Sequence, residues 1–184
     1  PDIKVLAGIE CDWVAIHLEK IKNGHLLPAA KVGDPSSDVA LTIEQTRIVD
    51  ESDWPWKDSI KRAPDGTGRI EIYIRGGKPQ VAMAVYPVAG NYQYEFLMDQ
   101  VKFALDEVGF DGFYIDQFAM VRSVVKTYDK WDGFSGDIDQ ETGQIKRKYY
   151  DANIAGIEAR VKLCRYALDK GKIVVANTYA TSAE

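Results

Sequence analysis

The sequence predicts an α/β fold in which helices connect parallel strands, and two stretches of the chain carry this prediction. Residues 94–108 place apolar side chains three and four positions apart, the spacing of one helix face, and Gly109 supplies a helix stop. An apolar strand over 113–115 follows after a short turn. The same order returns near the C-terminus, with a helix over 152–169 and a strand over 173–176. Helix, turn and buried strand in this order usually build a parallel sheet.

The N-terminal third of the chain gives one clear element. Residues 3–9 predict a first strand with polar residues at its end, Glu10-Cys11-Asp12. The next residues, 13–21, fit neither the helix period nor the strand period. Pro, Gly and Ser mark 23–38 as a loop, and 39–48 return as a strand or a short helix.

The middle of the chain predicts a pair of strands. Residues 69–75 alternate polar and apolar side chains, many of them β-branched, as a half-buried strand does. Gly76-Gly77 suits a tight turn, and 81–86 predict the next strand. Neither this glycine pair nor Gly66-Thr67-Gly68 has the spacing of a phosphate-binding loop. An open doubly wound sheet that binds a phosphorylated ligand is therefore the least favoured alternative.

Composition excludes several classes of protein. At 184 residues the chain suits one domain, and 23 basic against 28 acidic residues give a net charge of −5 without long runs of one sign. We therefore expect neither a nucleic acid nor an anionic membrane as partner. No apolar run approaches the roughly 20 residues that span a bilayer. Cys11 and Cys164 lack the paired spacing of a zinc site or a disulfide framework, and the chain has only two histidines.

Asp116 stands at the end of the predicted strand 113–115, the place where parallel sheets and barrels bind ligands. Asp is also a common helix N-cap, so a structural role is the alternative. Residues 117–120 begin no amphipathic helix and lead into a long aromatic and acidic segment. A carboxylate that faces such a loop fits a functional site better than a cap. Asn177 follows the strand over 173–176 in the same way.

Aromatic residues gather in the segments that would form the loops of a site. Tyr86 ends a predicted strand, and Trp131 lies next to Asp132 in the long segment after Asp116. Aromatic rings stack on the apolar faces of sugars, and carboxylates accept hydrogen bonds from sugar hydroxyl groups. We expect Tyr86, Trp131, Asp132 and Asn177 to bind a carbohydrate substrate. Packing of these rings in the core is the alternative.

One acidic segment invites a calcium interpretation. Asp137, Asp139 and Glu141 have the alternate spacing of an EF-hand loop, but Thr142 stands where that loop requires Gly and no Glu closes it. Residues 139–145 predict instead a polar turn between two short strands. We expect no metal site and no cofactor.

Residues 81–180 resemble the catalytic barrels of glycoside hydrolases, in particular the α-galactosidase-like and related families. In those enzymes the fourth barrel strand reads Gly-hydrophobic-Asp-Gly-hydrophobic-Tyr-hydrophobic-Asp and carries a carboxylate nucleophile, and Gly109 to Asp116 has this form. Residues 81–86 look like their third strand and 173–177 like their fifth. The resemblance implies an α/β fold that is part of a (β/α)8 TIM-type barrel. It also implies a retaining glycosidase with Asp116 as nucleophile.

The similar enzymes carry a second carboxylate, the acid/base, on a later strand. The chain stops at Glu184 before such a strand, and a full barrel takes about 250 residues. We therefore expect a single domain, 1–184, that is a piece of a larger glycosidase-like barrel and pairs with the remainder of the parent chain. A loop carboxylate, Asp132 or Asp137, is the alternative acid/base. The alternative function is a non-catalytic carbohydrate-binding or assembly module that uses the aromatic loop surface.

Overall fold

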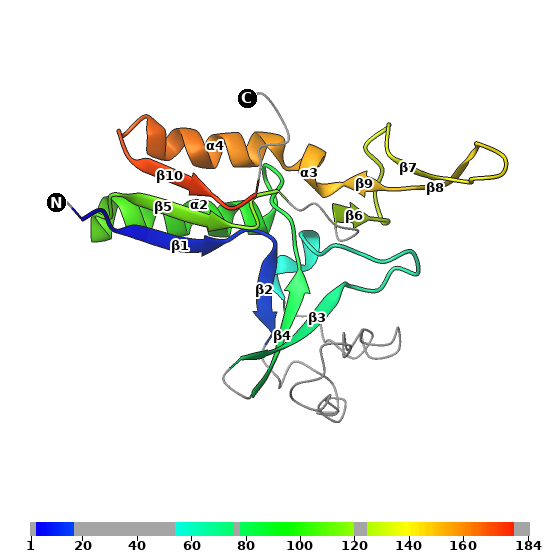
Figure 1. Ribbon diagram of the computed structural model, residues 1–184, viewed down its shortest axis with the longest axis horizontal. Coiled ribbons are helices and arrows are strands. Elements are labelled where there is room, and N and C mark those ends of the chain that lie inside the picture. The colour runs from blue at the N-terminus through cyan, green and yellow to red at the C-terminus, as the bar shows by residue number, and fades with distance from the viewer. Residues whose placement is uncertain (1–2, 17–53, 76–77, 120–124, 179–184) are drawn as a thin grey trace.

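A computed structural model describes residues 3–16, 54–75, 78–119 and 125–178 of the chain (Figure 1). The loop expected over 23–38, the element expected over 39–48 and the Gly76-Gly77 turn lie outside these residues.

A three-stranded parallel sheet forms one half of the described fold. It consists of β1 (Leu6–Glu10), β5 (Gly112–Asp116) and β10 (Ile173–Ala176), in the spatial order β1-β5-β10. The predicted parallel pairing of the strands at 113–115 and 173–176 is confirmed. The second neighbour of β5 is β1.

Two helical segments cover one face of this sheet, as the sequence predicts (Figure 1). The first is α2 (Tyr92–Lys102), which continues into a wider π-helical turn, η4 (Phe103–Val108), before Gly109 ends it with φ 83°. The second consists of α3 (Ala152–Ala155) and α4 (Ile157–Leu168). Their apolar stripes meet the sheet in a core that contains Ile9, Leu97, Val101, Leu105, Phe113, Ile115, Leu163 and Ala167.

The opposite face of the sheet is open to solvent along β5 and β10. Because side chains alternate along a strand, Tyr114 and Asp116 point away from the core that holds Phe113 and Ile115. Tyr114 and Val175 are 36% and 39% exposed. Asp116 therefore lies at one end of an open sheet face.

A second sheet is antiparallel and corrects the predicted fold class. It contains β2 (Trp13–Ile16), β4 (Lys78–Ala84) and β3 (Ile70–Arg75), in the order β2-β4-β3. The expected third barrel strand lies here and does not pair with β5. The prediction of a (β/α)8 TIM-type barrel is therefore wrong for the residues described. Only two residues separate β3 from β4, and such a link joins antiparallel strands, whereas a parallel crossover needs a dozen or more.

Four short strands and one helical turn complete the described chain. These are η3 (Pro55–Asp58), β6 (Lys126–Thr127), β7 (Gly136–Ile138), β8 (Ile145–Lys148) and β9 (Tyr150–Asp151). Strand β6 pairs with β9, and β7 pairs with β8. The polar turn predicted between two short strands is confirmed, because Asp139 Oδ1 accepts hydrogen bonds from Glu141 N and Thr142 N.

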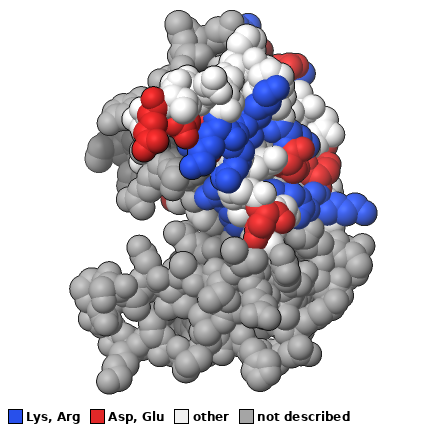
Figure 2. Space-filling view, turned by 90° about the vertical axis from the view of Figure 1, so that its right-hand side faces the viewer, with Lys and Arg blue, Asp and Glu red and all other residues white. Residues whose placement is uncertain are grey.

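The end of the molecule that carries the β7–β8 hairpin mixes charges of both signs. Figure 2 shows Lys and Arg side chains gathered on this face with Asp and Glu side chains among them. Lys126 Nζ, for example, lies 2.6 Å from Asp137 Oδ1. Within the described ranges, no helix has the length and apolar character that a bilayer crossing requires.

Two glycines in neighbouring strands give a test of the sheet geometry. A Cβ atom at Gly112 would lie 2.0 Å from the Ile173 carbonyl oxygen, whereas one at Gly8 would meet nothing within 4 Å. We expect Gly112→Ala to lower the free energy of unfolding by about 2 kcal/mol or more, since backbone cannot move aside as a side chain can. Gly8→Ala should change it by less than about 0.5 kcal/mol. Urea denaturation of both variants makes the comparison, and equal stabilities would contradict the β5–β10 packing.

Candidate active site

Two carboxylates end neighbouring parallel strands at the same level. Glu10 is the last residue of β1 and Asp116 the last of β5, and the two are register partners. In-register residues of adjacent parallel strands point to the same face, which is here the one opposite the helices. Asn177 follows the last residue of β10 at the same edge. The sheet therefore brings Glu10, Asp116 and Asn177 together.

The Asp116 carboxylate is held by two hydrogen-bond donors. Its Oδ1 accepts from Asn177 Nδ2 at 2.6 Å and from the Gln117 backbone N–H at 3.0 Å. Its backbone oxygen accepts from Cys11 N at 3.2 Å, which joins the end of β5 to the chain that leaves β1. The sequence predicts Asp116 and Asn177 as site residues, and the structure places them in contact.

Glu10 has the environment of a carboxylic acid that keeps its proton near neutral pH. Burial of the side chain is the largest cause, and the charges of Asp116 and Asp12 add to it, so that the pKa rises from 4.5 to about 7. The backbone N–H groups of Asp12 and Trp13 oppose this rise, and Asp12 N lies 3.0 Å from Glu10 Oε1. The edge of the sheet thus carries one carboxyl group with a pKa close to neutral pH.

Backbone strain is concentrated just beyond the two strand ends. Among the described residues, Gln117 (φ 53°) and Thr178 (φ 80°) are the non-glycine residues with positive φ. Such conformations are uncommon, and a β-branched residue such as Thr178 adopts them only where surrounding contacts enforce them. Thr178 Oγ1 accepts from Ala119 N at 3.0 Å and donates to the Ala119 carbonyl at 2.7 Å, and Phe118 N donates to the Asn177 carbonyl. These contacts bind the two loops together beside Asp116.

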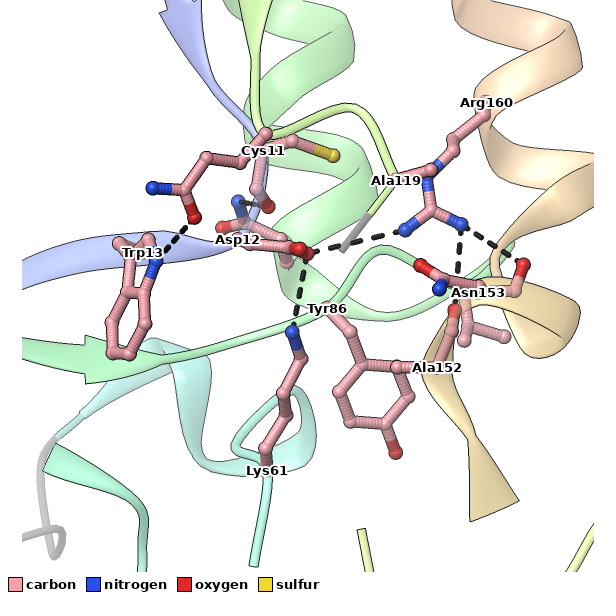
Figure 3. A network of polar contacts seen from close by, with 12 residues as sticks. Cys11, Asp12, Trp13, Lys61, Tyr86, Ala119, Ala152, Asn153 and Arg160 are labelled. Atoms are coloured by element: carbon pink, nitrogen blue, oxygen red, sulfur yellow. Dashed lines mark hydrogen bonds and ion pairs between the residues drawn. The ribbon is translucent and has the colours of Figure 1, made fainter. Parts of the chain in front are cut away.

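A buried cluster of three charges lies behind the site (Figure 3). Asp12 Oδ1 is 3.3 Å from Lys61 Nζ and 3.9 Å from Arg160 Nη2. Burial raises the pKa of Asp12 and lowers that of Lys61, while each charge opposes the shift of the other. Both carboxylate oxygens of Asp12 lack a hydrogen-bond partner among the described residues, so ion pairing is what compensates their burial.

Hydrogen bonds to the Cys11 and Asp12 carbonyl groups fix the corner at which the chain passes from the parallel to the antiparallel sheet. Gln93 Nε2 donates to the Cys11 carbonyl at 2.8 Å, and Val85 N donates to the Asp12 carbonyl at 2.8 Å. Burial raises the pKa of the Cys11 thiol to about 12. Cys11 is therefore a buried neutral thiol and cannot act as a nucleophile near neutral pH.

The other predicted sugar-binding residues are held by contacts of their own. Tyr86 is fully buried, and Lys130 Nζ donates to its hydroxyl group at 3.2 Å. Trp131 is 46% exposed, but Lys148 Nζ lies 3.9 Å from the centre of its ring. None of the contacts described for Tyr86, Trp131 or Asp132 joins them to Asp116.

Asp132 has a structural function that the sequence did not indicate. Its carboxylate accepts hydrogen bonds from the backbone N–H groups of Phe134, Ser135 and Asp151. Burial alone would raise its pKa, but these donors outweigh burial and lower the pKa to about 2. Asp132 therefore ties the 131–135 turn to β9.

Sequence reasoning missed Glu10 as a site residue, and it also missed Trp13. The polar triplet Glu10-Cys11-Asp12 at the end of a predicted strand was the available signal, because strand ends are where parallel sheets bind ligands. Trp13 donates a hydrogen bond from Nε1 to Gln117 Oε1. Its place beside Asp116 depends on a contact across 104 residues, which no local pattern reveals.

Comparison with known proteins finds no matching family model, no matching curated protein and no matching solved structure. Among the described residues, no group of three or more His, Cys, Asp or Glu side chains is arranged to hold a metal ion. The chemistry of the site is therefore inferred from its own residues.

Removing one partner of the buried ion cluster should be strongly destabilising. We expect Lys61→Met to lower the free energy of unfolding by about 3 kcal/mol or more, because a buried carboxylate loses its nearest cation. Lys162→Met is the matched control, since Lys162 pairs with Glu158 at 2.6 Å on the exposed surface of α4 and should cost under about 1 kcal/mol. Denaturant unfolding measures both. Equal effects of the two substitutions would show that the cluster does not bear on stability.

Proposed function

We propose that this protein hydrolyses glycosidic bonds with retention of configuration, with Asp116 as nucleophile and Glu10 as acid/base. The observation that carries the proposal is the in-register placement of these two carboxylates at the ends of adjacent parallel strands. The proposal does not depend on a barrel, because the carboxyl edge of any parallel sheet can present a ligand site.

The strand spacing suits the chemistry. Adjacent strands lie about 4.8 Å apart, and the two carboxyl groups of retaining glycosidases are about 5 Å apart. Asp116 would attack the anomeric carbon while Glu10 donates its proton to the departing oxygen. Water would then release the sugar from Asp116, with Glu10 accepting a proton from that water.

The different surroundings of the two carboxyl groups support a division of roles. Glu10, with a pKa of about 7, holds the proton that the leaving oxygen needs. Asp116 receives hydrogen bonds from Asn177 and from the Gln117 backbone, which orient its oxygen toward a reaction partner. Pairs of titratable groups in contrasting environments are the usual basis of acid and base assignment.

A carbohydrate-binding module without chemistry is the second candidate. The observation in its favour is the exposure of Phe134 and Trp131, at 84% and 46%, in the turn that precedes β7. In that case Asp116 would have a purely structural role.

Asp116→Asn separates the two candidates. The substitution keeps the shape of the side chain and removes the charge, so we expect turnover of a 4-nitrophenyl glycoside to fall by several orders of magnitude at unchanged melting temperature. Asp111→Asn is the control, because Asp111 precedes the opposite end of β5 and binds Val5 N. Full turnover by Asp116→Asn would falsify the nucleophile assignment.

The loss of activity in Glu10→Gln should depend on the leaving group of the substrate. We expect a loss of about 10²-fold or more for a glycoside with a poorly leaving alcohol, and a much smaller loss for 4-nitrophenolate, which leaves without a proton. In the wild type, kcat/KM should fall as the pH rises through about 7, because Glu10 of the free enzyme then releases its proton. Glu10→Gln should lose this limb of the pH profile.

A stability measurement checks the same pKa without any substrate. Between pH 4.5 and about 7 the folded state holds a proton on Glu10 that the unfolded chain has released. The free energy of unfolding should therefore decrease as the pH rises across this window. Glu10→Gln should remove that part of the decrease, and an identical pH profile in the two proteins would contradict the assignment.

A further inference from the structure

Trp13 links the segments that follow the two strand ends of the candidate site. It is the first residue of β2 and follows Glu10 by three positions. Its indole Nε1 donates a hydrogen bond to Gln117 Oε1, and Gln117 directly follows Asp116. Figure 3 shows the Trp13 indole with this hydrogen bond to the amide oxygen. One aromatic side chain is thus anchored between the chain that leaves β1 and the chain that leaves β5.

The ring of Trp13 differs from those of the other three tryptophans in having no stacking partner within the described part of the chain. Trp54 and Trp56 pack edge to face with each other, and Trp56 also contacts Tyr92 and Phe96. The ring of Trp131 is covered by Lys148. Among the described residues, no aromatic ring or cation lies against Trp13, whose side chain is only partly buried.

The anchor of the indole is a strained residue. Gln117 holds φ 53°, a conformation that a glycine would adopt without strain, yet a glycine could not offer the amide oxygen. Backbone strain that persists at a site is usually retained for what it positions. Here the positioned group is the indole, because the Gln117 side chain ends on it.

The charge at this edge of the sheet restricts the ligand. Glu10 and Asp116 both carry carboxyl groups, and the two cations of the buried cluster, Lys61 and Arg160, face the Asp12 carboxylate. A uronate or sulfated sugar would meet the like charge of the Asp116 carboxylate here. A neutral sugar can instead place its apolar face on an aromatic ring while its anomeric carbon lies near the carboxylates.

We propose that Trp13 is the platform on which a neutral sugar ring stacks beside Glu10 and Asp116, and that Gln117 is the residue that positions this platform. The part concerning the reaction rests on the proposed glycosidase function. The platform itself is a binding feature and can be tested without turnover.

The kinetic test uses 4-nitrophenyl glycosides of neutral hexoses, with 4-nitrophenyl glucuronide as the charged probe. Trp13→Ala should raise KM about tenfold or more with a smaller effect on kcat, and Trp13→Phe should lie between it and the wild type. The glucuronide should be a poor substrate. Phe103→Ala, which removes an exposed aromatic ring from the helical segment η4, should leave KM unchanged. An unchanged KM in Trp13→Ala, or a preference for the glucuronide, would overturn the platform while leaving the proposed hydrolysis intact.

Gln117→Gly distinguishes a positioning role of Gln117 from a role in stability alone. This substitution relieves the positive φ and removes the indole acceptor, so we expect an unchanged or higher melting temperature together with a raised KM. A lower melting temperature with unchanged KM would show that Gln117 serves stability alone, and would overturn its positioning role. The variant also keeps the test decisive if Trp13→Ala does not fold.

Ligand binding separates the failure of this inference from failure of the glycosidase proposal. Neutral oligosaccharides are titrated into Asp116→Asn protein while tryptophan fluorescence is followed. A change in emission that Trp13→Phe abolishes supports the platform even if no glycoside is ever cleaved. If glycosides are cleaved but emission does not depend on Trp13, the platform is wrong and the hydrolysis stands.

Discussion

The structure depends on one buried carboxylate, that of Asp12. It lies where the chain leaves the parallel sheet for the antiparallel one, and it meets Lys61 from the segment after η3 and Arg160 from α4. Desolvation of an isolated charge at this depth would be prohibitive, so the three groups are stable only together. The backbone N–H of Asp12 also binds Glu10 Oε1, so the residue at the centre of the ion cluster also contacts the candidate acid.

The sequence predicted the parts of the fold that are recorded locally. The period of 94–108 and 152–169 predicted the two helical segments, and the order of helix, turn and strand predicted that β5 and β10 are parallel neighbours. It could not predict that β1 is the other neighbour of β5, since that pairing joins residues about a hundred positions apart. The barrel expectation failed because an apolar strand pattern such as that of 81–86 does not distinguish parallel from antiparallel partners.

As with the fold, the sequence predicted only those site residues that a local pattern marks. Asp116 and Asn177 could be found because each stands at the end of a strand with an apolar sequence, and the structure joins them, although β10 is largely exposed. Glu10 could not be assigned, because its high pKa arises from burial and from the charges of residues that only the folded chain assembles. Tyr86 and Trp131 show that an abundance of aromatic residues does not locate a site: the first is buried with its hydroxyl group bound to Lys130, and Lys148 lies over the ring of the second.

The register between β1 and β5 decides whether a folded molecule has Glu10 paired with Asp116. Glu10 faces Asp116 only in the observed register, and a slip of one residue would set Glu10 opposite Ile115 and turn it toward the apolar core. Gly8, which offers no side chain to lock the alignment, lies in the middle of β1. Backbone hydrogen bonds hold this register at each end, from Cys11 N to the Asp116 carbonyl and from Asp111 N to the Val5 carbonyl. A misaligned molecule would remain compact yet lack its paired acids, so a preparation's specific activity would report strand alignment as much as chemistry.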